Sequence, residues 1–202
     1  MSILSSEKLR DKSPKERVEL VLEQANNPVI TTNFRPYESA ILHLVTSVNP
    51  DIPVIWCDTG YNTAATYRHA QDLIERLKLN IKLYTPQQTV AYRKVFLGEP
   101  EIDTHEHDRF THQVKLEPFR RAMSELKPDV WFTNLRKGQT AHRDALGIVS
   151  YSSDNILKLS PFFEFSDNEL DAYLNQFDLP NEHDYVDPTK VLAHRECGLH
   201  LS

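Results

Sequence analysis

The C-terminal end of the chain carries the side chain best suited to nucleophilic chemistry, Cys197. This thiol lies between Arg195 and His200, with His194 close by, in a segment of polar and charged residues. Neighbouring cationic side chains stabilise a thiolate, which is the nucleophilic form of cysteine. Cysteines without a reactive role are usually buried among apolar side chains. Cys197 is therefore a candidate nucleophile, although its neighbours alone leave an unreactive thiol open.

The second cysteine, Cys57, ends an apolar run over residues 52–57 and is interpreted as a small core residue. Because the chain has only two cysteines, it cannot form a disulfide framework, a cysteine-rich zinc site or a four-cysteine iron–sulfur cluster on its own. Any sulfur chemistry must use one thiol, or two at most.

A cluster of potential metal ligands lies near the middle of the chain: His105, Glu106, His107 and Asp108, followed by His112. Imidazole and carboxylate groups suit zinc or iron. The cluster falls in a polar stretch over 98–112 that has no periodicity, and its spacing matches no metalloenzyme signature. We therefore expect a solvated loop here and no metal.

The scaffold for these residues is predicted by an alternation of β-branched runs and helical patterns, which is typical of parallel βαβ units. We expect strands over 28–32, 52–57, 81–84, 130–133 and 156–159. Helices are expected from Pro14 to about Asn26, over 37–48, 63–79, 90–96 and 115–126, and after the capping residue Ser166. The fold class is thus α/β, with a central, mostly parallel sheet flanked by helices.

The domain organisation follows from these elements. We expect an N-terminal helical segment over 1–27, one α/β domain over 28–178 and a C-terminal arm over 179–202. The arm has no helical or strand period and is predicted to be mobile over the surface.

Composition excludes several classes of protein. The chain has 202 residues, of which 23 are Lys or Arg and 29 are Asp or Glu, so its net charge is −6. This balance argues against binding to a nucleic acid backbone but allows a local basic pocket for a small anion. No apolar stretch approaches the roughly 20 residues that span a bilayer, and the N-terminus turns charged too early for a secretory signal. We expect a cytoplasmic protein without membrane or nucleic acid partners.

Several separated motifs resemble one family. The ending Glu196-Cys197-Gly198-Leu199-His200 is similar to the catalytic tail of the phosphoadenylyl-sulfate (PAPS) reductases, the thioredoxin-dependent branch of the sulfonucleotide reductases. The resemblance extends in order from about Pro28 through Asp58-Thr59-Gly60-Tyr61, Lys115-Leu116-Glu117-Pro118 with Arg121, Leu135-Arg136 with Arg143, and Lys158 with Pro161.

This resemblance implies an adenine-nucleotide alpha-hydrolase-like fold with the nucleotide at the carboxyl ends of the strands. It also implies a reaction in sulfate assimilation and cysteine biosynthesis. The Cys197 thiolate attacks the sulfur of PAPS, adenosine 3′,5′-bisphosphate leaves, and thioredoxin releases sulfite from the resulting S-sulfocysteine. The related adenylyl-sulfate reductases hold an iron–sulfur cluster, which two cysteines cannot bind, so the cluster-free branch is implied, with no bound cofactor. A homodimer is compatible with the resemblance.

Substrate-binding residues are implied in the same way. Cations must offset the charge that builds up between two anions, preferably arginines for their bidentate geometry. The residues expected to contact the substrate are Thr32, Asn33, Phe34, Arg35, Asp58, Thr59, Gly60, Lys115, Arg121, Arg136, Arg143, Lys158, Arg195 and His200.

Two departures from the family pattern leave alternatives open. Arg35-Pro36 stands where the family has a glycine, and the segment before Glu196 is shortened. We expect Arg35 to substitute as a cation for lost backbone donors, opposed by Glu38; alternatively, it obstructs the site. A nucleotide-binding member that has lost or changed its reductase activity is therefore a second hypothesis. ATP pyrophosphate cleavage is a third, but the Ser-Gly-Gly-x-Asp-Ser loop of such relatives is missing.

Overall fold

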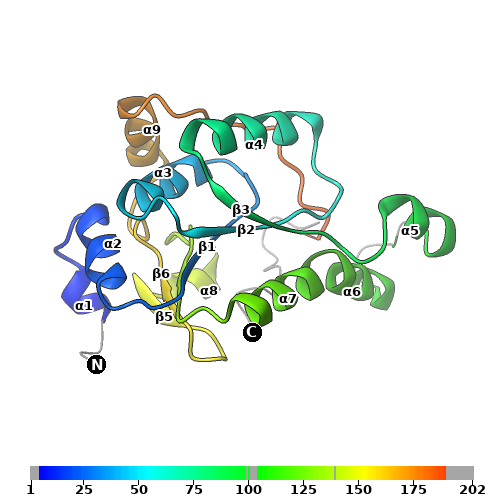
Figure 1. Ribbon diagram of the computed structural model, residues 1–202, viewed down its shortest axis with the longest axis horizontal. Helices are drawn as coiled ribbons and strands as arrows, with labels where there is room; N and C mark the ends of the chain where they lie inside the picture. The colour runs from blue at the N-terminus through cyan, green and yellow to red at the C-terminus, as the bar shows by residue number, and fades with distance from the viewer. Residues whose placement is uncertain (1–4, 99, 101–103, 139, 190–202) are drawn as a thin grey trace.

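Six strands form one sheet in the computed structural model, which describes residues 5–98, 100, 104–138 and 140–189 (Figure 1). The strands are β1 (Pro28–Thr32), β2 (Pro53–Cys57), β3 (Asn80–Tyr84), β4 (Val130–Phe132), β5 (Val149–Tyr151) and β6 (Leu157–Leu159). Their order is β3-β2-β1-β4-β6-β5, and every neighbouring pair is parallel except β5 and β6. The predicted α/β class with a mostly parallel sheet is confirmed.

Helices cover both faces of this sheet. On one face lie α2 (Pro14–Leu22), α3 (Glu38–Val48), α4 (Ala64–Leu77) and α9 (Asp167–Gln176), and on the other lies α7 (Glu117–Leu126) (Figure 1). Because side chains alternate along a strand, each strand contributes to both layers. In β4, Val130 and Phe132 join the larger core cluster, whereas Trp131 joins the smaller cluster against Phe119 and Ala122 of α7.

The N-terminal segment packs into the larger core cluster. Leu9 of α1 (Ser6–Leu9) and Val18 and Val21 of α2 are fully buried there. The predicted helix start at Pro14 is confirmed by a capping box between Ser13 and Glu16. The boundary at residue 27 stays a prediction, but these contacts tie the segment to the sheet.

The predicted end of that helix is four residues too late. The helix stops at Leu22, and the backbone N–H groups of Asn26 and Asn27 instead donate to the Asp129 carboxylate, at 2.7 and 2.9 Å. This long-range anchor replaces the last helical turn and joins the segment before β1 to the segment before β4. The cap of the last helix, in contrast, is as predicted, with Ser166 and Glu169 forming a capping box.

The polar stretch that we expected to be a loop is partly helical. After α5 (Val90–Phe96), it contains α6 (His105–Thr111) and leads into a π-helical segment, η1 (His112–Leu116), which continues into α7. The prediction of a loop was wrong because Thr104 caps α6 with its hydroxyl, a local signal that we overlooked. The short α8 (Ala141–Asp144) and the antiparallel edge strand β5 were also not predicted.

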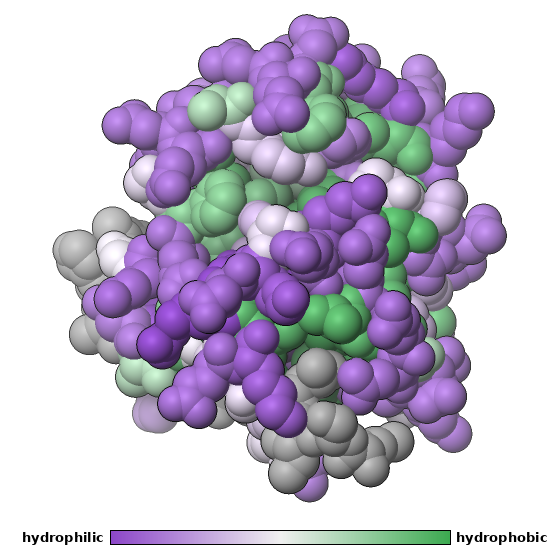
Figure 2. All heavy atoms as spheres, turned by 90° about the vertical axis from the view of Figure 1, so that its left-hand side faces the viewer, coloured by the Kyte–Doolittle hydropathy of each residue, from purple (hydrophilic) through white to green (hydrophobic). Residues whose placement is uncertain are grey.

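The surface on the side of α1 and α2 is mostly hydrophilic, with apolar side chains visible in the hollows between (Figure 2). One such hollow lies between α2, α3 and α9 and is lined by His43, Tyr173 and Phe177. Within the described residues, no helix combines the length and the apolar character that crossing a membrane requires.

Candidate functional site

A cavity lies at the carboxyl ends of β1, β2 and β4, on the face of the sheet that α7 covers. This is the point where the strand order reverses direction, from β1 to β2 on one side and to β4 on the other, and such a crevice is the usual ligand site of open α/β sheets. The described residues that line it are Thr31, Thr32, Asn33, Arg35, Glu38, Ile55, Cys57, Lys115, Phe119, Trp131, Thr133, Asn134, Leu135, Arg143, Tyr185 and Asp187.

The floor of the cavity is apolar and the rim is polar. Ile55, Phe119 and Trp131 belong to the smaller core cluster and form the floor. The indole N–H of Trp131 donates to the Thr31 hydroxyl over 2.9 Å, which fixes the ring beside that hydroxyl. An apolar surface beside hydroxyl groups suits an aromatic ligand that carries polar substituents.

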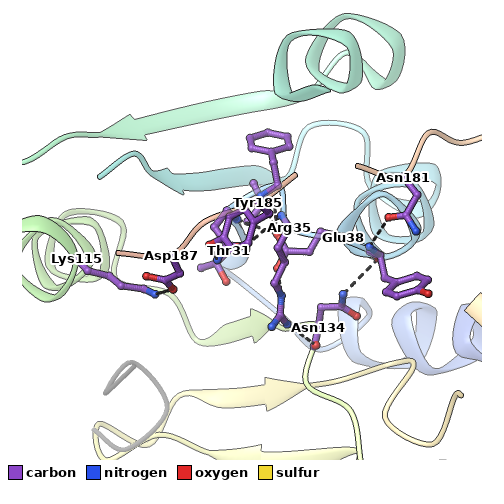
Figure 3. Close-up of polar contacts among 12 residues, drawn as sticks. Thr31, Arg35, Glu38, Lys115, Asn134, Asn181, Tyr185 and Asp187 are labelled. Carbon is purple, nitrogen blue, oxygen red and sulfur yellow. Dashed lines mark hydrogen bonds and ion pairs between the residues drawn. The ribbon is translucent and has the colours of Figure 1, made fainter. Parts of the chain in front are cut away.

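The loop between β1 and α3 forms one wall, and the Glu38 carboxylate organises it (Figure 3). One oxygen, Oε2, accepts hydrogen bonds from the Thr32 hydroxyl at 2.6 Å and from the backbone N–H groups of Asn33 and Phe34 at 2.8 and 3.1 Å. The other oxygen, Oε1, accepts from Arg35 Nε at 3.0 Å. Glu38 is 6% exposed, so this carboxylate is satisfied by the loop and hardly by water.

Arg35 and Phe34, two of the predicted contacts, differ in where their side chains lie. Arg35 lines the cavity, but its guanidinium is engaged by Glu38 and by the Asn134 carbonyl at 3.0 Å. Phe34 has a left-handed backbone (φ 55°), and its ring is buried in the core against Trp56, with the centroids 4.9 Å apart. Phe34 is therefore not among the residues that line the cavity.

A buried ion pair forms the opposite wall. Lys115, from η1, donates to the Asp187 carboxylate and, at 3.3 Å, to the Thr189 hydroxyl (Figure 3). Burial alone would raise the pKa of Asp187, but the Lys115 ammonium and the hydrogen bonds from Thr189 outweigh it and hold the pKa below its ordinary value. The cation that we predicted at position 115 is thus in the cavity, already facing a carboxylate of its own chain.

Asp187 belongs to a segment over 180–189 that lies across this edge of the sheet. The Asn181 side chain accepts from the Tyr37 backbone N–H at 2.8 Å, and the Tyr185 hydroxyl lies 2.6 Å from the Asn33 amide group. We predicted a mobile arm from residue 179 onward. The described residues up to 189 make polar contacts on both sides of the cavity, and the mobility of the arm stays a prediction.

The loop after β2 carries three further predicted residues. The Asp58 carboxylate accepts from the Gly60 N–H, the Asn62 amide and the Tyr67 hydroxyl, each at 2.9 Å. Gly60 needs its left-handed φ of 81°, and a Cβ there would lie 2.8 Å from Val90. Together with Thr59, these residues build the turn that follows β2, and none of the three lines the cavity.

The predicted cations divide into two groups. Arg143, 3% exposed, lines the cavity together with Arg35 and Lys115. Arg121, Arg136 and Lys158 lie outside its lining.

Each of these three has another contact. Arg121 donates to Glu117 at 2.9 Å, and Arg136 donates to Asp167 at 2.6 Å. Lys158 lies 5.7 Å from the centroid of the Trp131 ring, and burial lowers the pKa of its ammonium group. A substrate contact of these three cations stays a prediction.

Of the two cysteines, the structure describes only Cys57. Cys57 lines the cavity at the end of β2, so it is a wall residue as well as a core residue, and burial raises the pKa of its thiol to about 12. Cys197, Arg195 and His200 lie outside the described residues. Elsewhere in the described chain, no three His, Cys, Asp or Glu side chains group closely enough to hold a metal ion.

Sequence reasoning missed several residues of the wall: Thr31, Asn134, Tyr185 and Asp187. Thr31 could have been found, since the alternation along β1 places it on the same face as Val29. Tyr185 and Asp187 gave no signal, because the segment that carries them has no period.

Comparisons with known proteins show which family the chain resembles and which solved structures share its fold. Residues 27–184 match the family model described as "Phosphoadenosine phosphosulfate reductase domain". The chain is 40% identical over 172 residues to a phosphoadenosine 5′-phosphosulfate reductase of Xylella fastidiosa, covering 83% of this chain and 71% of the relative. A PAPS reductase of Candida auris in a phosphate complex superposes with a TM-score of 0.78 at 22% identity, over 90% of both chains. An FMN adenylyltransferase of Candida glabrata shares the fold at a TM-score of 0.61 and 10% identity, over 84% of this chain and 55% of the other.

Proposed function

Because the chain belongs to the phosphoadenosine phosphosulfate reductase family, we propose that its cavity binds PAPS and that Cys197 carries the sulfonate group during reduction. The chain is an oxidoreductase that reduces 3′-phosphoadenylyl sulfate to sulfite and adenosine 3′,5′-bisphosphate. The observation that carries the assignment of the site is the cavity itself. Its apolar floor suits an adenine ring, and Arg143 and Lys115 suit phosphate and sulfonate oxygens.

The chemistry proceeds in two transfers. The Cys197 thiolate attacks the sulfur of PAPS, the bond between that sulfur and the bridging phosphate oxygen breaks, and adenosine 3′,5′-bisphosphate leaves. A thiolate of reduced thioredoxin then attacks the sulfur of Cys197, forming a mixed disulfide and releasing sulfite. The second thioredoxin thiol resolves this disulfide and regenerates the Cys197 thiol. No bound cofactor is needed, because thioredoxin supplies both electrons.

Cations lower the barrier of the first transfer. Negative charge accumulates as a thiolate approaches an anionic sulfonate, and fixed positive groups offset it. Arg143 and Lys115 hold this role at the cavity wall, Arg195 and His200 flank the nucleophile, and the remaining predicted contacts stay part of the proposal. Cytoplasmic location, a role in sulfate assimilation, thioredoxin as partner and a homodimer belong to the same proposal.

A second candidate function is nucleotide binding without reduction. It is favoured by the pairing of Arg35 with Glu38, since the arginine that replaces the family glycine has its charge offset by the chain itself. This candidate predicts that adenosine 3′,5′-bisphosphate binds while no sulfite forms.

One experiment separates the two candidates. The reduced protein is mixed with PAPS in the absence of any reductant, and its intact mass is measured. The proposed function predicts the mass of one added sulfonate group, located on Cys197 by peptide mapping and removed by thioredoxin. An unmodified protein that still binds the nucleotide would favour the second candidate.

A further inference from the structure

The loop after β1 has the donor arrangement of an oxyanion cradle. Two consecutive backbone N–H groups, from Asn33 and Phe34, converge on one point together with the Thr32 hydroxyl. The left-handed backbone of Phe34 turns the chain so that these groups point the same way. Converging N–H groups of this kind form the concave anion sites found in phosphate-binding loops.

The anion in this cradle is supplied by the chain. Glu38 Oε2 lies at the point where the three donors converge, and its partner oxygen Oε1 takes the Arg35 Nε–H. The Glu38 carboxylate, on a residue that is 6% exposed, thus takes the Thr32 hydroxyl and the Asn33 N–H and shares the Phe34 N–H with the Thr32 hydroxyl oxygen, which lies 3.0 Å from that nitrogen. Charge-assisted hydrogen bonds are roughly twice as strong as neutral ones. A phosphate oxygen must therefore displace the Glu38 carboxylate, which is held at the site by the chain itself.

We propose that Glu38 is a specificity-determining residue: its carboxylate fills the oxyanion cradle formed by Thr32, Asn33 and Phe34 and keeps phosphate groups out of this part of the cavity. The inference rests on the proposed function only in that the cavity takes an anionic nucleotide. As a consequence, the anionic groups of the substrate bind on the side of Arg143, and the Glu38 side of the cavity takes uncharged, polar parts of the ligand.

The charge balance of the wall supports this division. Glu38 and Arg35 cancel each other over 3.0 Å, so this wall offers no net positive charge to a phosphate. Removing the carboxylate would leave two backbone donors, a hydroxyl group and a guanidinium around an empty volume. The variant wall would therefore bind a small oxyanion that the unmodified wall rejects.

The test measures the binding of inorganic phosphate and pyrophosphate to Glu38→Ala by calorimetry, at ionic strength held constant with chloride. We expect at least about a tenfold gain in affinity over the unmodified protein, and a rise in unfolding temperature with phosphate in the variant alone. The matched control is Glu164→Ala, which removes an acidic partner of Arg17 outside the cavity and should give no gain.

Two results would overturn the proposal: equal phosphate binding by the unmodified protein and Glu38→Ala, or no gain in a folded Glu38→Ala. If that variant does not fold, Glu38→Ser decides, because it empties the cradle and keeps a small polar side chain at the start of α3. It should bind phosphate more tightly than the unmodified protein, and affinity no higher than that of the unmodified protein would reject the proposal. None of these measurements involves PAPS turnover, so a failure of the reductase assignment would be recognised separately.

Discussion

At the scale of single residues, two of the cations that line the cavity form ion pairs within the chain. Arg35 faces Glu38 and Lys115 faces Asp187, so both of these cations contact carboxylates of their own chain. Arg143 is slightly more buried than Lys115 and lines the same cavity. A guanidinium can bind two oxygens of a phosphate or sulfonate at once, which makes Arg143 the strongest single candidate for an anion contact.

We therefore predict that Arg143→Ala weakens the binding of adenosine 3′,5′-bisphosphate by roughly 1.5–3 kcal/mol, the range for hydrogen bonds to charged groups. Isothermal titration calorimetry measures this change. Arg76→Ala is the matched comparison, because Arg76 lies outside the cavity and donates to Asp178. It should leave the affinity nearly unchanged. Equal losses of affinity in the two variants would show that Arg143 makes no specific anion contact.

The two thiols should also behave differently. With a pKa of about 12, only about one Cys57 side chain in ten thousand is a thiolate at pH 8. We predict that Cys57→Ser keeps most of the sulfite-forming activity, whereas Cys197→Ser abolishes it. Sulfite release with thioredoxin, and alkylation rates from peptide mass spectrometry, measure the two effects. Turnover by the Cys197→Ser protein would disprove the mechanism.

At the scale of elements, the segment over 180–189 completes the site. It contributes Tyr185 and Asp187 to the wall, and the Asp184 carbonyl accepts from the Thr63 and Thr66 hydroxyl groups at the start of α4, at 2.7 and 3.0 Å. These contacts join the end of the described chain to elements that follow β1 and β2. The ion pair between Asp187 and Lys115 is the part of this anchor that depends on pH.

The lowered pKa of Asp187 gives a direction for that dependence. The folded state binds the proton less tightly than the unfolded state, whose value is near 3.8. The ion pair thus stabilises the fold fully above about pH 4, and this contribution is lost as the pH falls through the lower pKa of the folded state. Urea unfolding between pH 2.5 and 7 should show a smaller acid-induced loss of stability for Asp187→Asn than for the unmodified protein.

The same variant tests how much the pair contributes at neutral pH. Leaving Lys115 buried without its carboxylate should lower the free energy of unfolding by up to about 3–5 kcal/mol. An identical dependence on pH in both proteins would show that Asp187 does not hold this pair in solution.

At the scale of the whole molecule, two core clusters and a few long-range polar anchors hold the segments around the sheet. Arg17 of α2 is the clearest anchor. Its guanidinium, 3% exposed, donates to the carbonyls of Leu9, Arg10 and Pro161 and to the Glu164 carboxylate, at 2.8–3.0 Å. It thereby connects the two N-terminal helices to the loop that follows β6.

We predict that Arg17→Met lowers the free energy of unfolding by at least about 1.5–3 kcal/mol, the value of one hydrogen bond to a charged group. Chemical denaturation followed by circular dichroism gives this number. Unfolding should remain a single transition, since the N-terminal helices share the core of the sheet. The affinity for adenosine 3′,5′-bisphosphate should not change, because neither Arg17 nor any of its hydrogen-bond partners lines the cavity. Two separate transitions would show that the N-terminal segment is an independent unit.

The sequence by itself determined the parallel strands of the sheet, most of its flanking helices and the family. Hydrophobic periodicity and capping residues act over a few positions, so the strands from β1 to β4 and the caps at Ser13 and Ser166 could be predicted from neighbours in the chain. The family followed from motifs whose residue types are specific, such as Asp58-Thr59-Gly60-Tyr61 and Glu196-Cys197-Gly198.

Only the tertiary structure decided which charged side chains meet. Arg121, Arg136 and Arg143 look alike as residue types, yet one lines the cavity and two pair with carboxylates elsewhere. Asp187 reaches Lys115 across 72 positions in an aperiodic segment, which no local pattern encodes. The strength of an ion pair depends on the distance between the two charges and on their burial. Both are set by how the chain packs in three dimensions, and residues adjacent in the sequence do not determine them.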